Sequence, residues 1–488
     1  MVKDFLKELI KYIPSKVIPG ILGFILIPIM TRLFGPKEYG NYVIVITTVS
    51  VLSIIAFDWI GPSMTRFYAE YQREAKLRRL FNGTVITLSI SSMIAIAVTA
   101  FFIILVCKPM FKDNLYYYLN VGLLMFCFGV AFNAMSSMLY VARRVKLYSF
   151  FSVWRQTGCV LIGVVLVVIW KLGVDGLLWG SVIGIVVMLP ILFKLGVKQF
   201  RIKDCSKSLG KAMMGYGFPL IATNLAAWAL ALSDRYIIGH FRGSYEVGLY
   251  SISYSIADNS VRLIESLIVL ASAPIVMESW ETKGVEDTRS FIHDMTKYYL
   301  IITLPATIGL IMLSGRLVKM LTTSGFHRGY VIMPMVAGSV FVFGLQRSFQ
   351  LGLLFYKKTN LIMYILMLSG MINVMLNLVL VPKYGYVAAG YNILVSYLVF
   401  MILMIYVSRK YFVWKFPFRT LLNSSLAAIF MSLVVHIILR LTGDHLIRGI
   451  ALSIVAGACA YFGLLILIGE IRRDVFCRLQ SLMANKTL

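Results

Sequence analysis

The stretch 17-VIPGILGFILIPIMTRLFGPKEYGNY-42 joins an uncharged apolar run to a cationic turn and then starts a second apolar run. Together with the residues before it, the first run is long enough to cross the hydrocarbon core of a bilayer as a helix. Gly35-Pro36 and Tyr39-Gly40 favour a tight external turn between two such helices, and Arg32 marks the end of the first. The stretch therefore predicts a hairpin of two membrane-spanning helices.

Apolar runs of similar length recur along the whole chain. Of its 488 residues, 59% are apolar and 14% are charged, and the mean hydropathy is +0.84, whereas a soluble domain is about half apolar and a quarter charged. Because irregular backbone cannot face lipid, the predicted fold is an all-α polytopic membrane bundle. The fourteen predicted spans are residues 10–33, 41–62, 83–107, 116–140, 147–170, 176–197, 216–239, 246–274, 298–315, 330–356, 360–381, 386–407, 420–439 and 449–469.

The net charge of +26 is distributed as in a membrane protein rather than as in a nucleic-acid-binding protein. With the N-terminus placed in the cytoplasm, most of the 47 lysines and arginines fall in cytoplasmic segments, as the positive-inside rule requires. The strongest of these segments are 66-RFYAEYQREAKLRR-79 and residues 198–211. We expect a multi-pass protein of the cytoplasmic membrane with both termini cytoplasmic, surrounded by lipids and without a nucleic-acid partner.

The cysteines and histidines show no pattern of a disulfide framework, a metal site or an acid–base catalyst. The six cysteines are scattered, several of them within predicted spans, so they are interpreted as small apolar packing residues. The five histidines are isolated, and no predicted loop is long enough for a soluble catalytic domain. We therefore expect no cofactor, no metal site and no enzymatic activity.

The two halves of the chain share three landmarks in the same order, which predicts an internal duplication. The opening hairpin has a looser counterpart in 234-DRYIIGHFRGSYEVGLY-250. The cationic turn 139-LYVARRVKLY-148 corresponds to 354-LFYKKTNLIMY-364, and 170-WKLGVDGLLWGSV-182 corresponds to 382-PKYGYVAAGYNIL-394. Six spans per half would make the halves parallel repeats, an arrangement found in alternating-access transporters. The predicted organisation is an N-lobe at 1–200, a cytoplasmic linker at 201–214, a C-lobe at 215–408, and two extra spans with a cytoplasmic tail at 409–488.

Residues 32–42 of the opening hairpin resemble the R-x-x-G-P-x-x-Y-G-x-Y turn of polysaccharide flippases. These proteins form the Wzx-like branch of the multidrug/oligosaccharidyl-lipid/polysaccharide superfamily. The Gly-Tyr-x-Ala-Ala-Gly pattern at 385–390 and the twofold six-span plan are similar too. The resemblance implies flipping of a polyprenyl-pyrophosphate-linked oligosaccharide through a V-shaped pair of lobes that open alternately inward and outward. Polysaccharide assembly enzymes are candidate partners, and a monomer is the simplest assembly.

Charged residues within the predicted spans form the candidate substrate site, because a charge at mid-bilayer costs about 3 kcal/mol and usually faces a cavity or another charge. Arg262 and Arg347 lie near the middle of their spans and are expected to face the lumen. Cations nearer the span ends could instead reach the headgroups. Guanidinium groups suit phosphate because they pair with it bidentately and stay charged. The cationic set is Arg262, Arg347, Arg235, Arg32, Lys16 and Arg155.

Further polar residues align with these cations on the predicted helices. The face shared by Asp258, Arg262 and Glu265 is either a wall of the cavity or an ion-pair stripe that only locks helices together. Trp228 is either a platform for a sugar ring or a packing residue. The sugar-contacting set is Asn224, Trp228, Gln346 and Gln350, and the carboxylates that could couple Na⁺ or a proton are Asp58, Asp258 and Glu265.

Three other functions compete with the flippase interpretation. A multidrug cation antiporter of the same superfamily would need an acidic cavity, whereas the charges within the spans lean basic. A murein-precursor flippase would share the fourteen spans and the cationic lumen, so the sequence separates it poorly. A membrane-embedded glycan polymerase or ligase usually carries a long external loop, for which the predicted spans leave no room.

Overall fold

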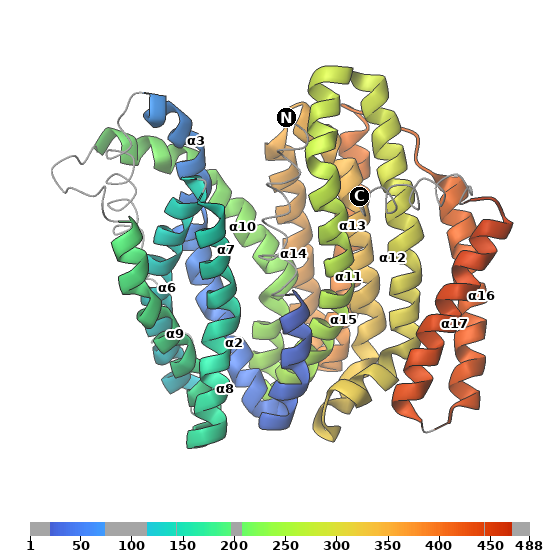
Figure 1. Ribbon diagram of the computed structural model, residues 1–488, viewed down its shortest axis with the longest axis horizontal. Coiled ribbons are helices and arrows are strands. Elements are labelled where there is room, and N and C mark those ends of the chain that lie inside the picture. The colour runs from blue at the N-terminus through green and yellow to red at the C-terminus, as the bar shows by residue number, and fades with distance from the viewer. Residues whose placement is uncertain (1–19, 74–114, 143, 197–206, 444, 471–488) are drawn as a thin grey trace, which may run out of the picture. The chain divides into compact units, whose positions relative to one another are not determined.

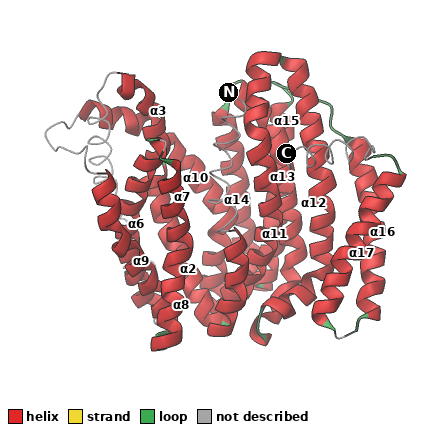
Figure 2. Ribbon diagram, in the orientation of Figure 1, coloured by secondary structure: helices red, strands yellow, loops and turns green. Residues whose placement is uncertain are grey.

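A computed structural model describes residues 20–73, 115–142, 144–196, 207–443 and 445–470, and within these ranges the chain forms helices and short connections without a strand (Figure 2). The elements are Gly20–Leu33, α2 (Pro36–Ser53), the π-helical turn η1 (Ile54–Asp58), α3 (Ile60–Arg73), α6 (Leu115–Val141), α7 (Val145–Val153), the π-helical turn η3 (Trp154–Gly158), α8 (Cys159–Trp170), α9 (Gly173–Gly196), α10 (Lys207–Arg242), α11 (Ser244–Glu278), the π-helical turn η6 (Ser279–Lys283), α12 (Val285–Leu321), the 3₁₀ helix η7 (Ser324–Ile332), α13 (Met333–Phe355), α14 (Thr359–Tyr384), α15 (Tyr386–Ser408), α16 (Phe418–Leu441) and α17 (Leu446–Leu467).

Twelve helical stretches in the described part of the chain are long and apolar enough to cross a membrane, and each corresponds to a predicted span. The first predicted span, residues 10–33, is represented by the shorter helix Gly20–Leu33, because its earlier residues lie outside the described ranges. The third predicted span, residues 83–107, lies wholly outside them. The all-α polytopic fold is therefore confirmed.

The chain divides into two compact units. Unit 1 comprises Met1–Ile252 and Met363–Asn392, and unit 2 comprises Ser253–Ile362 and Ile393–Leu488. The helices α11, α14 and α15 therefore each contribute residues to both units. The lobe boundaries expected from the sequence stay a prediction, and the linker expected at 201–214 ends within the first turns of α10.

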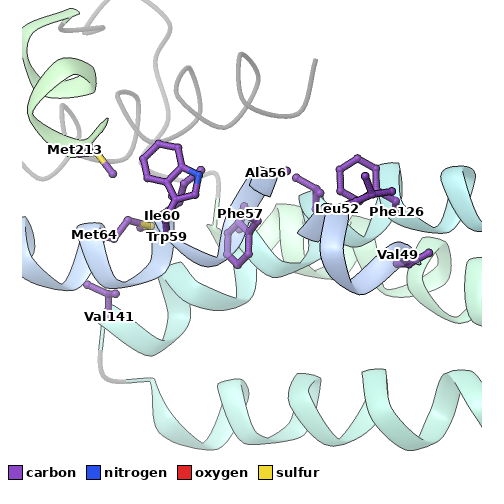
Figure 3. Close-up of a cluster of buried hydrophobic side chains, with 12 residues drawn as sticks. Val49, Leu52, Ala56, Phe57, Trp59, Ile60, Met64, Phe126, Val141 and Met213 are labelled. Carbon is purple, nitrogen blue, oxygen red and sulfur yellow. The ribbon is translucent and has the colours of Figure 1, made fainter. Parts of the chain in front are cut away.

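Unit 1 is held together by apolar packing of α2, η1 and α3 against α6 and the start of α10 (Figure 3). Phe57 and Ile60 lie in the same buried cluster as Phe126 of α6 and Met213 of α10. Elsewhere in the unit, α9 packs against both α8 and α6 (Figure 1). Small residues allow the close approach of α8 and α9, since a Cβ on Gly180 would overlap the backbone of Gly163.

Unit 2 contains a group of three helices in which α16 and α17 pack against each other and against α12 (Figure 1). Its buried side chains include Met431 of α16 and Tyr461 of α17. The Tyr461 hydroxyl donates a hydrogen bond of 3.1 Å to the carbonyl oxygen of Ile301 on α12. The phenol thus buries its ring among apolar side chains while its polar atom is satisfied within the bundle.

The connection in the opening hairpin is shorter than the sequence predicts. The helix Gly20–Leu33 is followed by only Phe34 and Gly35, and α2 begins at Pro36. Tyr39 and Gly40 lie inside α2, so their predicted place in the turn is wrong. Proline suits the first helical position because its φ is already fixed and its missing N–H would have no partner there. The Glu38 carboxylate accepts a hydrogen bond of 3.0 Å from the N–H of Gly35 and completes the helix start.

Gly40 instead brings the two predicted hairpins together within unit 1. In the second hairpin, Gly243 turns the chain with a φ of +85° and α11 begins at Ser244. A Cβ on Gly40 would overlap the carbonyl oxygen of Ser244, and a Cβ on Gly248 would overlap the carbonyl oxygen of Pro36. The first turns of α2 and α11 thus cross backbone to backbone, with each glycine against the first residue of the other helix.

The third landmark of the predicted duplication has the same backbone conformation in both halves. Gly173 and Gly385 take φ values of +59° and +65°, which glycine adopts without the steric cost of a side chain. Gly385 is followed by Tyr386, whose N–H donates a hydrogen bond of 2.9 Å to the carboxylate of Glu246 on α11. Arg242 Nε donates a hydrogen bond of 3.0 Å to the same carboxylate, so the second hairpin also holds the start of α15.

Glu470 follows α17 and joins three helices of unit 2. Its carboxylate accepts hydrogen bonds from the Thr420 hydroxyl and, at 2.7 Å, from Asn423 Nδ2, both on α16. Lys297 Nζ of α12 lies 3.4 Å from Glu470 Oε1. Burial opposes the charged form, but the hydrogen bonds and the ammonium together hold the pKa of the Glu470 carboxyl below its usual range.

We predict that Gly40→Ala lowers the free energy of unfolding by about 1–3 kcal/mol, because the added methyl group must displace the Ser244 carbonyl at the helix crossing. The matched control is Gly215→Ala in α10, where a Cβ would meet no atom within 4 Å and alanine favours the helix. Thermal unfolding of the purified protein in detergent measures both variants. Equal unfolding temperatures for the two variants would contradict the crossing.

We also predict that Glu470 stabilises the fold in a pH-dependent way. A carboxyl with a lowered pKa in the folded state contributes stability above its unfolded pKa and loses that contribution as the pH falls through its folded pKa. The unfolding temperature of the wild type should therefore exceed that of Glu470→Gln at pH 7, and the difference should shrink below about pH 4. A difference that is the same at both pH values would contradict the prediction.

Candidate functional site

Unit 1 contains a cavity of about 770 Å³ between its helices. Four elements form its walls: α2 with η1, α6, α7 with η3, and α10. Asp58, Arg155, Asn224 and Trp228, four of the residues singled out from the sequence, line it together. The other lining residues are Ile46, Val49, Ser50, Ser53, Ile54, Phe57, Met125, Phe132, Asn133, Ser136, Ser137, Tyr148, Ser152, Gln156, Ala227, Ala231 and Leu232.

Each of the two charged residues of this cavity lies on a π-helical turn. Asp58 ends η1, and Arg155 lies within η3. π-Helical turns are rare and occur frequently at functional sites, because the extra residue changes the direction in which side chains point. The carboxylate and the guanidinium line the same cavity. The π-helical turns thus place one charge of each sign among lining side chains that, within the described part of the chain, are otherwise uncharged.

The remaining polar groups of the cavity are amides, hydroxyls and one indole. Trp228 Nε1 donates a hydrogen bond of 3.0 Å to Ser50 Oγ, which itself donates to the carbonyl oxygen of Thr47. This chain fixes the indole of α10 against α2. The Ser136 hydroxyl is buried and has no hydrogen-bond partner among the described residues. The cavity therefore offers a fixed aromatic side chain and a hydroxyl free to bind a polar ligand.

Unit 2 contains the charged cluster predicted on α11, with a different pairing. Arg262 donates three hydrogen bonds of 2.7–3.0 Å to both oxygens of Asp258, one turn earlier. Glu265 was expected on the same stripe, but it pairs with Arg347 of α13, whose Nε lies 2.7 Å from Oε1. The Glu265 side chain is only 4% exposed, whereas the side chains of Arg262 and Arg347 are 39% and 43% exposed.

Phe343 of α13 joins the two arginines. The guanidinium carbon of Arg262 lies 5.6 Å from the centre of the Phe343 ring, and that of Arg347 lies 5.7 Å from it. Cations at this distance from an aromatic face are attracted by its quadrupole. The ring itself packs against Tyr397 and Phe400 of α15. An aromatic side chain that the sequence analysis did not single out therefore holds both mid-span arginines.

The other predicted site residues lie elsewhere. Arg235 is buried in unit 1 and does not line the cavity. Its Nη1 lies 3.4 Å from Asp234 Oδ1, and its guanidinium lies over the Tyr250 ring. Arg32 is exposed near the end of the helix Gly20–Leu33. Gln346 is buried beside Arg347, while Gln350 is partly buried on the same helix. Lys16 lies outside the described residues.

Unit 1 also contains a buried ladder of asparagines that was not predicted from the sequence. Asn373 Nδ2 donates to the Leu230 carbonyl oxygen of α10 at 2.9 Å, and Asn377 Nδ2 donates to Asn373 Oδ1 at 3.0 Å. Asn392 of α15 donates to Asn377 Oδ1 at 3.0 Å. The spacing of four between Asn373 and Asn377 in an apolar run was the available signal. Such side chains bind helices together where water is absent.

A second cavity of about 420 Å³ lies within unit 2, between α11, α12, α16 and α17. Its walls are mostly apolar, with Ile302, Leu310, Val435 and Phe462 among the lining side chains. The two cavities therefore differ in chemistry. The polar one lies in unit 1, where the sugar-contacting residues Asn224 and Trp228 were predicted.

The sequence matches the family described as "Polysaccharide biosynthesis protein" over residues 29–330. It is also similar to the "Probable low-salt glycan biosynthesis flippase Agl15" of Haloferax volcanii. The two sequences are 19% identical over 313 residues, which is 64% of this chain. The aligned region covers 66% of the relative, just under two thirds of its length.

Two solved structures share the fold. The lipid II flippase MurJ in an inward closed conformation has a TM-score of 0.75 and 15% identity, covering 95% of this chain and 98% of its own. An inward-facing multidrug resistance MATE family transporter of the MOP superfamily has a TM-score of 0.64 and 14% identity, covering 82% and 97%. At these identities the similarity establishes the fold, and function has to be argued from the site.

We predict that Arg347→Gln lowers the free energy of unfolding by about 1–3 kcal/mol, because it leaves the buried Glu265 carboxylate without its counter-charge. The partial exposure of Arg347 keeps the loss below that of a fully buried pair. The double variant Glu265→Gln/Arg347→Gln should recover most of the loss. A double-mutant cycle of thermal unfolding in detergent tests this, and strictly additive losses would show that the two side chains do not interact.

Proposed function

The chain belongs to the polysaccharide biosynthesis protein family, within the multidrug/oligosaccharidyl-lipid/polysaccharide flippase superfamily, and on this basis we propose that it flips a polyprenyl-pyrophosphate-linked oligosaccharide. The substrate would pass from the cytoplasmic to the outer leaflet of the cytoplasmic membrane. The family match confirms the resemblance that the opening hairpin indicated. It does not specify the glycan or its lipid, so the substrate is argued from the site.

The observation that carries the proposal is the polar cavity of unit 1. A glycan presents hydroxyl and amide groups and the apolar faces of its sugar rings. The amides of Asn133, Asn224 and Gln156, together with the serine hydroxyls, offer donors and acceptors in the cavity, and Trp228 offers an aromatic face. A volume of about 770 Å³ is in the range of sites that bind small molecules. This chemistry suits a sugar headgroup within a bundle whose outer surface faces lipid.

Arg262 and Arg347 in unit 2 are proposed as phosphate-binding groups in their own right. Both guanidinium groups are partly exposed, although each has a carboxylate partner. Guanidinium groups bind phosphate oxygens bidentately. Because the cell interior is negative, the membrane potential favours outward movement of an anion by roughly 2.3 kcal/mol per charge per 100 mV. Coupling to Na⁺ or a proton through Asp58, Asp258 or Glu265 remains part of the proposal.

The cavity chemistry favours this function over a multidrug cation antiporter. An antiporter for organic cations needs an acidic cavity, but the carboxylate of Asp58 shares its cavity with Arg155. The fold similarity to a murein-precursor flippase leaves that alternative open, because both substrates join a sugar headgroup to a lipid phosphate.

The proposed orientation places both termini in the cytoplasm, on the positive-inside distribution of lysine and arginine.

We predict that Trp228→Ala reduces flipping of a fluorescent polyprenyl-pyrophosphate oligosaccharide at least about tenfold in proteoliposomes, because the sugar ring of the substrate loses the aromatic side chain on which it stacks. Trp228→Phe should keep most of the activity. The matched control is Trp170→Ala, since Trp170 is exposed near the end of α8 and does not line the cavity.

The same assay tests the phosphate assignment with Arg262→Ala and Arg347→Ala. Loss of flipping in both, in protein that is still folded at the temperature of the assay, would support the assignment. Normal flipping in both would make these arginines structural. If the wild type does not flip the substrate but exports an organic cation, the antiporter replaces the flippase.

A further inference from the structure

We propose that the cavity of unit 1 selects uncharged glycans and that Asp58 is the residue that determines this selectivity. The inference rests on the proposed function and deepens it, because it names the class of sugar headgroup. Asp58 would neutralise Arg155 within the cavity and thereby deny that cation to the carboxylate of an acidic sugar.

The proposal rests on the charges of the residues that line the cavity. Among the described residues that line it, Asp58 and Arg155 are the charged ones, and their charges cancel. They come from separate elements, η1 and η3, so the balance is built by the tertiary structure. The other polar lining side chains, such as Asn133 and Gln156, are neutral at every physiological pH. A ligand therefore enters a polar cavity whose described lining residues carry no net charge.

Arg155 is held in place by packing on α6. Its guanidinium carbon lies 5.7 Å from the centre of the Phe132 ring. Its Nη2 lies 3.4 Å from the position that a Cβ on Gly129 would occupy, so the guanidinium rests against the backbone of α6. The turn that carries it is anchored by Trp154, whose Nε1 donates a hydrogen bond of 2.9 Å to the Gly184 carbonyl oxygen. The cation consequently stays at the cavity whether or not a ligand is bound.

An acidic sugar would bring a second carboxylate to a site whose described lining residues include one cation, Arg155. Like charges in a partly desolvated site raise each other's energy, and one of the two carboxylates would have to give up the guanidinium or become protonated. An uncharged sugar meets no such obstacle. Its hydroxyl groups would bond to the amides and to Ser136, whose buried hydroxyl has no partner among the described residues. The Asp58 carboxylate thus acts against acidic competitors and leaves neutral sugars unaffected.

The same charges predict how selectivity should change on substitution. Asp58→Asn keeps the size of the side chain but leaves Arg155 without its counter-charge, so the cavity becomes cationic and should accept an acidic glycan. Arg155→Gln makes the cavity anionic and should reject acidic glycans more strongly than the wild type. The double variant Asp58→Asn/Arg155→Gln is neutral again and should behave like the wild type in its choice of substrate.

The experiment compares two synthetic substrates on the same polyprenyl pyrophosphate, one with a neutral tetrasaccharide and one in which a single sugar is a hexuronic acid. Flipping rates of both are measured in proteoliposomes for the wild type, the two single variants and the double variant. The readout is the ratio of the neutral to the acidic rate, which a general loss of folding does not alter. We expect the wild type to favour the neutral substrate by at least about tenfold, and Asp58→Asn to lower this ratio by at least about tenfold.

Each other result has a defined meaning. A wild type that flips the acidic substrate as fast as the neutral one overturns the proposal. An unchanged ratio in Asp58→Asn overturns the role of Asp58, and a double variant that favours the acidic substrate overturns the charge balance as the cause. Absence of flipping of both substrates by the wild type is the distinct result that defeats the proposed function itself.

Discussion

The energetic cost of placing charge in hydrocarbon governs how this structure is built. An ionised side chain within a membrane-spanning helix is stable only beside an opposite charge, a hydrogen-bonding group or a water-filled space. Four pairs of described charges inside the spans follow this rule. Asp58 and Arg155 share a cavity, Asp258 holds Arg262, Glu265 lies against Arg347, and Asp234 lies beside Arg235.

These pairs differ in what surrounds them, and the difference separates structural from functional groups. Asp234 and Arg235 are both buried, so their contacts are to other parts of unit 1 and serve its packing. Arg262 and Arg347 of unit 2 are partly exposed and contact the Phe343 ring, whereas Glu265, the partner of Arg347, is buried. Asp58 and Arg155 line an open cavity on π-helical turns. The degree of exposure, rather than the presence of a charge, therefore marks the groups that can meet a substrate.

The hydrocarbon environment, which excludes water, also determines how the helices are held to one another. Without a strong hydrophobic drive between helices in lipid, close backbone contact and polar side-chain bonds must hold them. Gly40 and Gly248 permit the crossing of α2 and α11, and Gly163 with Gly180 permits that of α8 and α9. The asparagines of α14 and α15 add hydrogen bonds in the same unit. Glycine and asparagine thus add close backbone contacts and hydrogen bonds to the packing of large apolar side chains such as Phe57 and Phe126.

Length, hydropathy and turn residues were enough to predict the twelve described membrane spans, because a bilayer of nearly constant thickness requires about 20 mostly apolar helical residues wherever the chain crosses it. The motif at residues 32–42 was enough to indicate the family, since a proline helix start and a small-residue crossing need particular residues at fixed spacing. Asp58 and Arg155 were also visible as charges in apolar runs. That they share one cavity, and that Glu265 pairs with Arg347 instead of Arg262, depended on which helices become neighbours. Helical spacing reports only the residues that share a face of one helix, whereas a site between helices depends on their rotation and packing, which only the tertiary structure specifies.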